Sequence, residues 1–241
     1  MEDLEKQMWK KVEKYVGLLN FVPFLRMVAV CNNLAFSNLN EKSDIDLFIV
    51  AKAGRLFLVR SFVTAILHLA GVRRHGKKVA GRFCLSFFVD DSCLNLSPIA
   101  IEDDVYLKVW TKTLVPVIDD GVSKDFIVLN SWIDDDFEAS FGEMNRPVFF
   151  FRKSKSKVFL QWLFSGKLGD FIENALSNWQ LKRAREKAAT LTDSTNLLIN
   201  DHILKFHNFD RRREYRGLWR AKFGNSKISL GKFRELTINK N

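Results

Sequence analysis

Two aspartates that precede an apolar strand have the clearest chemical potential in this sequence. Asp44 and Asp46 stand two positions apart, just after Ser43, and lead into the run Leu-Phe-Ile-Val. On an extended strand both side chains point to one face, with Cα atoms about 6.6 Å apart. Two carboxylates this close are costly beside apolar residues unless a cation lies between them. The pair therefore predicts a Mg²⁺ or Mn²⁺ site, and the alternative is a pair of solvated acids at the edge of a strand.

The segments around these acids predict an α/β arrangement. Apolar runs with β-strand character alternate with helical spacing, and the strands are apolar on both faces, as expected for strands covered by helices. The sequence predicts strands at 24–31, 45–50 and 83–89, and helices at 2–19, 55–70, 101–115, 157–187 (one long or two short) and 211–223. The segment 126–133 fits either a strand or a buried helix, and a polar loop is expected from residue 190. The expected divisions are an N-terminal helix (1–23), an α/β domain (24–97), a helical extension (98–145) and a basic, mainly helical C-terminal region (146–241), with a boundary near Arg146-Pro147.

The segment from Phe24 to Leu96 resembles the nucleotidyltransferase superfamily typified by DNA polymerase β. The resemblance is carried by an apolar strand, a polar turn and the pattern Asp-apolar-Asp at the start of the next strand. It implies a mixed sheet covered by helices, with two Mg²⁺ ions held by Asp44 and Asp46. It also implies transfer of a nucleotidyl group from an NTP to an acceptor hydroxyl or phosphate, with pyrophosphate leaving. A catalytically silent nucleotide- or RNA-binding module with the same fold is the alternative.

The turn after the first strand departs from the family pattern. The family has Gly-Ser where this sequence has Asn32-Asn33. Asparagine tolerates left-handed backbone conformations, and its amide can donate to a phosphate oxygen. Asn32, Asn33 and Ser43 are therefore the expected nucleotide-binding residues, in a weakened phosphate turn.

The third acid that the family resemblance requires is missing from the expected strand at 83–89. Asp90 or its neighbour Asp91 can replace it as the general base, provided that the strand brings its far end near Asp44. Without a base, proton removal loses a contribution of about 10²–10⁴ in rate. A basic loop that contains Arg73, Arg74 and Arg82 either meets the NTP phosphates or is exposed loop charge.

The basic residues are concentrated in the last two-fifths of the chain. Residues 1–145 contain 17 Lys+Arg and 20 Asp+Glu, whereas residues 146–241 contain 21 and 8, and the chain totals +10. This predicts an anionic partner, with RNA favoured over a membrane and a solvated basic face as the alternative. The run Arg211, Arg212 and Arg213 is the candidate RNA contact, while the apolar residues at helical spacing in 215–223 are expected to face the core.

Composition excludes several other classes of protein. With 47% hydrophobic residues the chain is not disordered as a whole, and Cys31, Cys84 and Cys93 form no CxxC pair. His202 and His207 lack the spacing of zinc proteases, and no cysteine is near them in the sequence, so no zinc site is expected. The apolar run 56–71 is too short to span a bilayer. A reducing, cytoplasmic location is expected, and the oligomeric state stays open.

Overall fold

One six-stranded mixed sheet organises the computed structural model, which describes residues 2–139, 141, 154–189, 197–206 and 211–238. The strand order is β4-β1-β2-β3-β6-β5; β2 and β3 are parallel, and the other neighbouring pairs are antiparallel. The strands are β1 (Leu25–Cys31), β2 (Ile45–Ala51), β3 (Phe83–Asp90), β4 (Val115–Asp119), β5 (Leu197–Ile199) and β6 (Ile203–Phe206). The mixed sheet and the first three strands confirm the predicted fold class.

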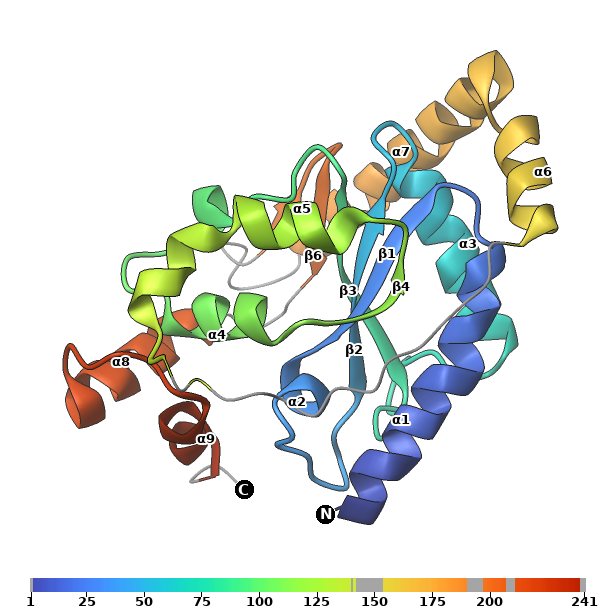
Figure 1. Cartoon of the computed structure of the whole chain (residues 1–241). Coiled ribbons are helices and arrows are strands. Elements are labelled where there is room, and N and C mark those ends of the chain that lie inside the picture. Colours follow the sequence, from blue (N-terminus) through green and yellow to red (C-terminus); the bar gives the residue numbers. More distant parts are fainter. Residues whose placement is uncertain (1, 140, 142–153, 190–196, 207–210, 239–241) are drawn as a thin grey trace.

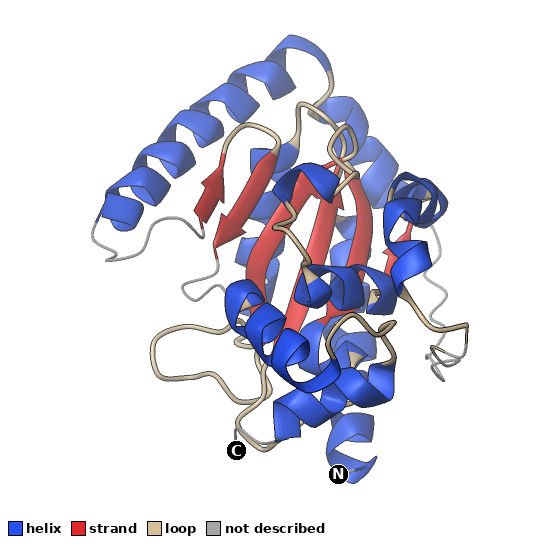
Figure 2. Cartoon of the chain, turned by 90° about the vertical axis from the view of Figure 1, so that its left-hand side faces the viewer, coloured by secondary structure: helices blue, strands red, loops and turns tan. Residues whose placement is uncertain are grey.

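Helices cover both faces of this sheet (Figures 1 and 2). The helices are α1 (Glu2–Val16), α2 (Asn32–Ala35), α3 (Leu56–Leu69), α4 (Val105–Thr113), α5 (Val122–Leu129), α6 (Lys155–Leu163), α7 (Gly166–Ala189), α8 (Arg212–Phe223) and α9 (Leu230–Ile238), with 3-10 turns η1 (Gly17–Phe21), η2 (Ser97–Ile99) and η3 (Ser131–Asp136). Phe48 of β2 packs against Trp110 of α4 and Phe126 of α5, whereas Phe83 of β3 meets Tyr15 of α1. Every residue of β2 is buried, which explains its nearly continuous apolar sequence.

The crossover from β2 to β3 is made by α3, whose first turn is tied to α7. The backbone N–H groups of Phe57 and Leu58 both donate to the carboxylate of Glu173, each at 2.8 Å. A carboxylate satisfies the unpaired N–H groups of a helix N-terminus and suits its positive dipole end. Burial raises the pKa of Glu173, while these two hydrogen bonds oppose that effect. The described part of the C-terminal region is thus packed onto the crossover helix.

Three strands lie where the sequence predicted helix or loop. The segment 98–145 contributes β4, which pairs with β1, and the region from 146 onward contributes the hairpin of β5 and β6, which pairs with β3. The sheet therefore draws strands from all three expected divisions after residue 23. The segment 126–133 is helical, in α5 and η3, and 157–187 forms two helices. The expected boundary at Arg146-Pro147 lies outside the described residues.

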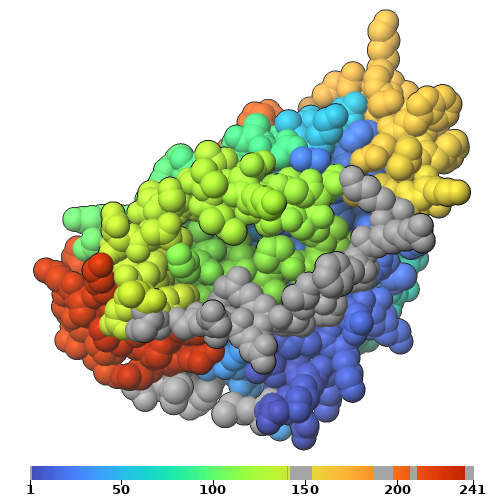
Figure 3. All heavy atoms as spheres, viewed as in Figure 1, coloured from blue at the N-terminus to red at the C-terminus, as the bar shows by residue number. Residues whose placement is uncertain are grey.

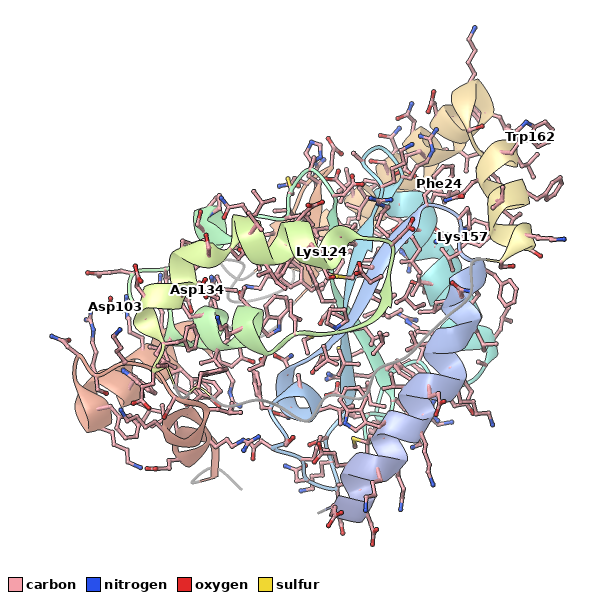
Figure 4. The ribbon with its side chains drawn as sticks, in the orientation of Figure 1. Phe24, Asp103, Lys124, Asp134, Lys157 and Trp162 are labelled. Atoms are coloured by element: carbon pink, nitrogen blue, oxygen red, sulfur yellow. The ribbon has the colours of Figure 1, made fainter. Side chains whose placement is uncertain are left out.

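The helices α6 and α7 carry exposed aromatic side chains. Figure 3 shows these helices, in yellow and light orange, projecting from one corner of the molecule, and Figure 4 shows Trp162 pointing outward. Lys157 of the same α6 points the other way, is buried, and donates to the carbonyl of Leu25 at 2.8 Å.

Among the described residues, no helix combines the length and apolar character needed to cross a membrane.

Candidate functional site

The two predicted metal ligands lie where β1 ends and β2 begins, and a cysteine joins them. Asp46 of β2 pairs with Cys84 of the parallel strand β3, and Asp44 precedes β2 on the same face. The carboxylate oxygens of Asp44 and Asp46 and the Sγ of Cys84 all lie within 4.8 Å of one another. Within the part of the chain that the structure describes, this cluster has a thiol as its third member rather than a third carboxylate.

Arg74 supplies the positive charge that the paired acids need. Its Nη1 lies 2.7 Å from Asp44 Oδ2 and 3.7 Å from Cys84 Sγ. Burial lowers the pKa of Arg74, whereas the neighbouring Asp44 and Cys84 raise it. The net effect is a raised pKa, so the guanidinium keeps its charge. Of the three arginines predicted in this basic loop, Arg74 is the one that reaches the acids, whereas Arg82 donates to the loop carbonyls of Gly71 and Arg73.

The carboxyl group of Asp46 has a raised pKa. Burial and the neighbouring charge of Asp44 raise its pKa from 3.8 to about 6, against hydrogen bonds from Asn32 and Cys84 and the charge of Arg74. Burial and the two aspartates also raise the pKa of the Cys84 thiol. Near neutral pH the thiol is therefore protonated and donates to the Asp46 carboxylate.

The asparagine turn is part of this site through Asn32. Asn32 begins α2 with a left-handed φ of 56°, a conformation that asparagine tolerates better than most residues. Its Oδ1 accepts from the hydroxyl of Tyr106 at 3.0 Å, which leaves the amide hydrogens to donate to Asp46. Asn33 lies at the next position of α2 and is half-buried. Ser43 is buried, and its hydroxyl exchanges hydrogen bonds with Asn40 inside the loop.

An aromatic cluster from the C-terminal helices holds this turn in place. Tyr106 of α4 packs against Tyr215 of α8 at 5.0 Å between ring centroids, and Tyr215 stacks on Phe233 of α9 at 5.3 Å. Phe233 in turn contacts Phe36, just after α2, at 5.4 Å. The described part of the C-terminal region therefore packs against Tyr106, which donates to Asn32.

Asp90 cannot complete the site, which corrects the prediction that it replaces the missing acid. Because β3 runs parallel to β2, Cys84 lies beside Asp46, while Asp90 lies beside Ala51 at the other end of the sheet. Asp90 is six residues from Cys84 along β3, which corresponds to about 20 Å. Asp91, which follows Asp90, ion-pairs with Arg26 at 3.3 Å at that same far end.

One of the three arginines predicted to contact RNA is buried. Arg212 is buried, donates to the carbonyl of Ile99 at 2.5 Å and lies 3.4 Å from Asp104, so it cannot serve as an RNA contact. Arg211 is exposed and pairs with Glu214, 3.6 Å away, and Arg213 is exposed. The acidic loop before α4 faces α8, as the position of Asp103 in Figure 4 shows, and carboxylates of this loop pair with arginines of α8. Tyr215 and Trp219 face the core as predicted.

The donor set fits a hard divalent cation in part. Two carboxylates together with substrate phosphates and water are a usual Mg²⁺ environment, whereas a thiol is not a magnesium ligand. Asp44 and Asp46 are thus the residues that can hold Mg²⁺ or Mn²⁺, with Cys84 beside the ion. No protein-family model matches the chain, and no curated protein matches it either. The geometry of these side chains is therefore the ground on which a function can be argued.

Proposed function

We propose that this chain binds a nucleoside triphosphate with Mg²⁺ or Mn²⁺ at Asp44 and Asp46 and transfers its nucleotidyl group to an acceptor hydroxyl or phosphate. The observation that supports the proposal is that four groups converge in one site: Asp44 just before β2, Asp46 within β2, the Asn32 amide and the Arg74 guanidinium. Carboxylates for a metal beside nitrogen donors for phosphate are the groups that phosphoryl chemistry uses.

Each of these side chains has a distinct role in the proposal. The cation, when bound, offsets the negative charge of the triphosphate and of the transferring phosphorus group. Arg74 is about half-exposed, so with a cation held by the two acids its guanidinium would be available to a phosphate oxygen. Asn32, oriented by Tyr106, donates to Asp46. These groups position the reacting phosphate, and positioning supplies much of the catalysis in phosphoryl transfer.

Cys84 favours a second candidate, a module that binds nucleotide without transferring it. It stands beside Asp46 on β3, and its raised pKa keeps it a thiol, which cannot accept the proton of an attacking hydroxyl. We therefore expect transfer to be slow, by a factor of about 10²–10⁴ relative to a site with a general base.

Nucleotide binding is tested by thermal shift with each NTP, with and without Mg²⁺ or Mn²⁺. Asp44→Asn and Asp46→Asn should abolish the metal-dependent stabilisation and leave the fold intact. Asp125→Asn, an exposed acid on α5, is the matched control and should behave as wild type. Nucleotide affinity that is unchanged in both site variants would remove the metal site from the proposal.

Transfer is tested with α-labelled NTPs and a mixed pool of RNA and protein acceptors. The double variant Asn32→Gly with Asn33→Ser restores the family's turn, and glycine accepts the φ of 56° without strain. We expect slow wild-type transfer and faster transfer by the variant. Metal-dependent NTP binding with no transfer by either protein supports the silent module, whereas robust wild-type transfer that the variant loses shows that the asparagines are a working phosphate turn.

A further inference from the structure

A second cluster of ligand-bearing side chains lies at the opposite end of the sheet from Asp44 and Asp46. Asp90 ends β3, Cys93 belongs to the turn that follows, and His202 lies in the turn between β5 and β6. Their carboxylate oxygen, thiol sulfur and imidazole nitrogen all lie within 4.8 Å of one another. Carboxylate, thiolate and imidazole are the three kinds of protein ligand that Zn²⁺ takes.

Backbone pairing between β3 and β6 brings the three residues together. Val89 pairs with Ile203, and the N–H of Asp90 donates to the carbonyl of His202 at 3.0 Å. On one side, the N–H of Cys93 donates to the carbonyl of Asp90 at 3.1 Å. On the other, Asn200 Oδ1 accepts from the N–H groups of His202 and Ile203 at 2.9 and 2.7 Å. Both turns are thus fixed by hydrogen bonds, and the cluster is built into the fold.

The side chain of Asp90 is fully buried and already turned toward the histidine. Its Oδ1 accepts from the N–H and hydroxyl of Ser92, at 3.0 and 2.5 Å, and its Oδ2 lies 2.8 Å from His202 Nδ1. A buried carboxylate needs a positive charge or strong donors to offset its desolvation. A cation bound between Asp90 and His202 would supply that charge.

Access to the cluster is open on the histidine side. The His202 side chain is 58% exposed, and Cys93 is half-buried. In a tetrahedral zinc site, nitrogen and oxygen ligands about 2.0–2.2 Å from the ion stand roughly 3.4 Å apart. The contact between Asp90 and His202 must therefore open by about half an ångström, which an exposed imidazole on a hairpin turn can provide. Three protein ligands leave a fourth position for water.

We propose that Asp90, Cys93 and His202 form a Zn²⁺ site, separate from the nucleotide site proposed above. The sequence concealed it because Cys93 and His202 are far apart in the chain and meet through strand pairing. The mixed sulfur, nitrogen and oxygen set prefers Zn²⁺ to Mg²⁺, whereas the two aspartates at the other end prefer Mg²⁺. The two ends of the sheet therefore differ in the metal that they select.

The test uses the full chain, reduced and freed of metal, with Cys84→Ser as the parent protein. This change removes the thiol of the other cluster, and the remaining Cys31 is buried. Zn²⁺ affinity is measured by competition with a chromophoric chelator, and Co²⁺ is added separately to detect thiolate-to-metal charge-transfer absorption. Cys93→Ser and His202→Gln are then made in this parent, and far-ultraviolet circular dichroism checks that each variant folds.

We expect the parent to bind Zn²⁺ and to show the Co²⁺ thiolate band. Cys93→Ser should lose that band, and both variants should weaken Zn²⁺ binding by at least about tenfold, since loss of outer-shell partners alone costs about 10–100-fold. Absence of Zn²⁺ binding in the parent overturns the proposal. Equal Zn²⁺ affinity in the parent and in folded Cys93→Ser also overturns it, and so does retention of the thiolate band in that variant.

Discussion

Replacing Asp46 by asparagine should stabilise the protein at high pH. The pKa of Asp46 is raised from 3.8 to about 6, so the folded state holds its proton more tightly than the unfolded chain does. Stability is therefore lost as the pH rises from about 4 to about 6, and the loss persists above that range. A difference of 6 minus 3.8 corresponds to at most about 3 kcal/mol. Asp46→Asn has no such titration, and its amide can still accept from Asn32 and Cys84.

The measurement is urea unfolding of wild type and Asp46→Asn at intervals from pH 4 to pH 8, with a chelator to remove divalent metal. The variant's free energy of unfolding relative to wild type should rise by up to about 3 kcal/mol between pH 4 and pH 8, with the change centred between pH 4 and pH 6. Comparing the two proteins at each pH cancels the titration of the groups that they share. Asp125→Asn, which removes an exposed carboxylate on α5, is measured in parallel as the control.

Two results would refute the reasoning about Asp46. A difference between wild type and variant that stays constant with pH would mean that the carboxyl group is not perturbed. A variant that becomes relatively less stable as the pH rises would mean that the ionised carboxylate stabilises the fold, with Arg74 and Asn32 outweighing burial and the charge of Asp44. Either outcome would also weaken the case that a cation is needed at this site.

Two further predictions concern Arg212 and Tyr106. Arg212→Met should destabilise the protein by about 3 kcal/mol in urea unfolding, because the buried carboxylate of Asp104 loses its guanidinium partner. Arg213→Ala, at an exposed position, is the control and should change stability by less than about 0.5 kcal/mol. Equal effects of the two changes would contradict the buried pair. Tyr106→Phe removes the hydroxyl that donates to Asn32, so it should lower the free energy of unfolding by about 1 kcal/mol and weaken metal-dependent NTP binding. Unchanged NTP affinity would show that the Asn32 amide is oriented without this hydrogen bond.

The central fold is predictable from the sequence because its strands are long, apolar and separated by clear breaks. The predicted strands at 24–31, 45–50 and 83–89 correspond to β1, β2 and β3 within a residue. The strand β4 was missed because it directly follows α4, with no turn signal to separate them. The β5–β6 hairpin carries a usable signal, since Asn200-Asp201 lies between two short apolar runs. Such short strands are stable only when paired with another strand, and β3 provides that partner.

Part of the candidate site could be predicted from the sequence, and part could not. Asp44, Asp46 and Asn32 are local in the sequence, and the spacing of the two acids alone places them on one face. Arg74 and Cys84 enter the site through tertiary structure, the first from a loop and the second through strand register. A cysteine inside an apolar strand carries no mark that distinguishes it from a core residue.

The direction of β3 determines which side chains meet at each end of the sheet. An antiparallel β3 would have brought Asp90 toward Asp44, as the prediction of a third acid at this site required. The α3 crossover instead makes β3 parallel to β2, so the residue beside Asp46 is Cys84, a protonated thiol that cannot act as a base. The parallel direction of β3 also places Asp90 at the far end of the sheet, where the turn before β6 brings His202 within 2.8 Å of it. The slow transfer proposed at one end and the zinc site proposed at the other are thus both consistent with the direction of β3.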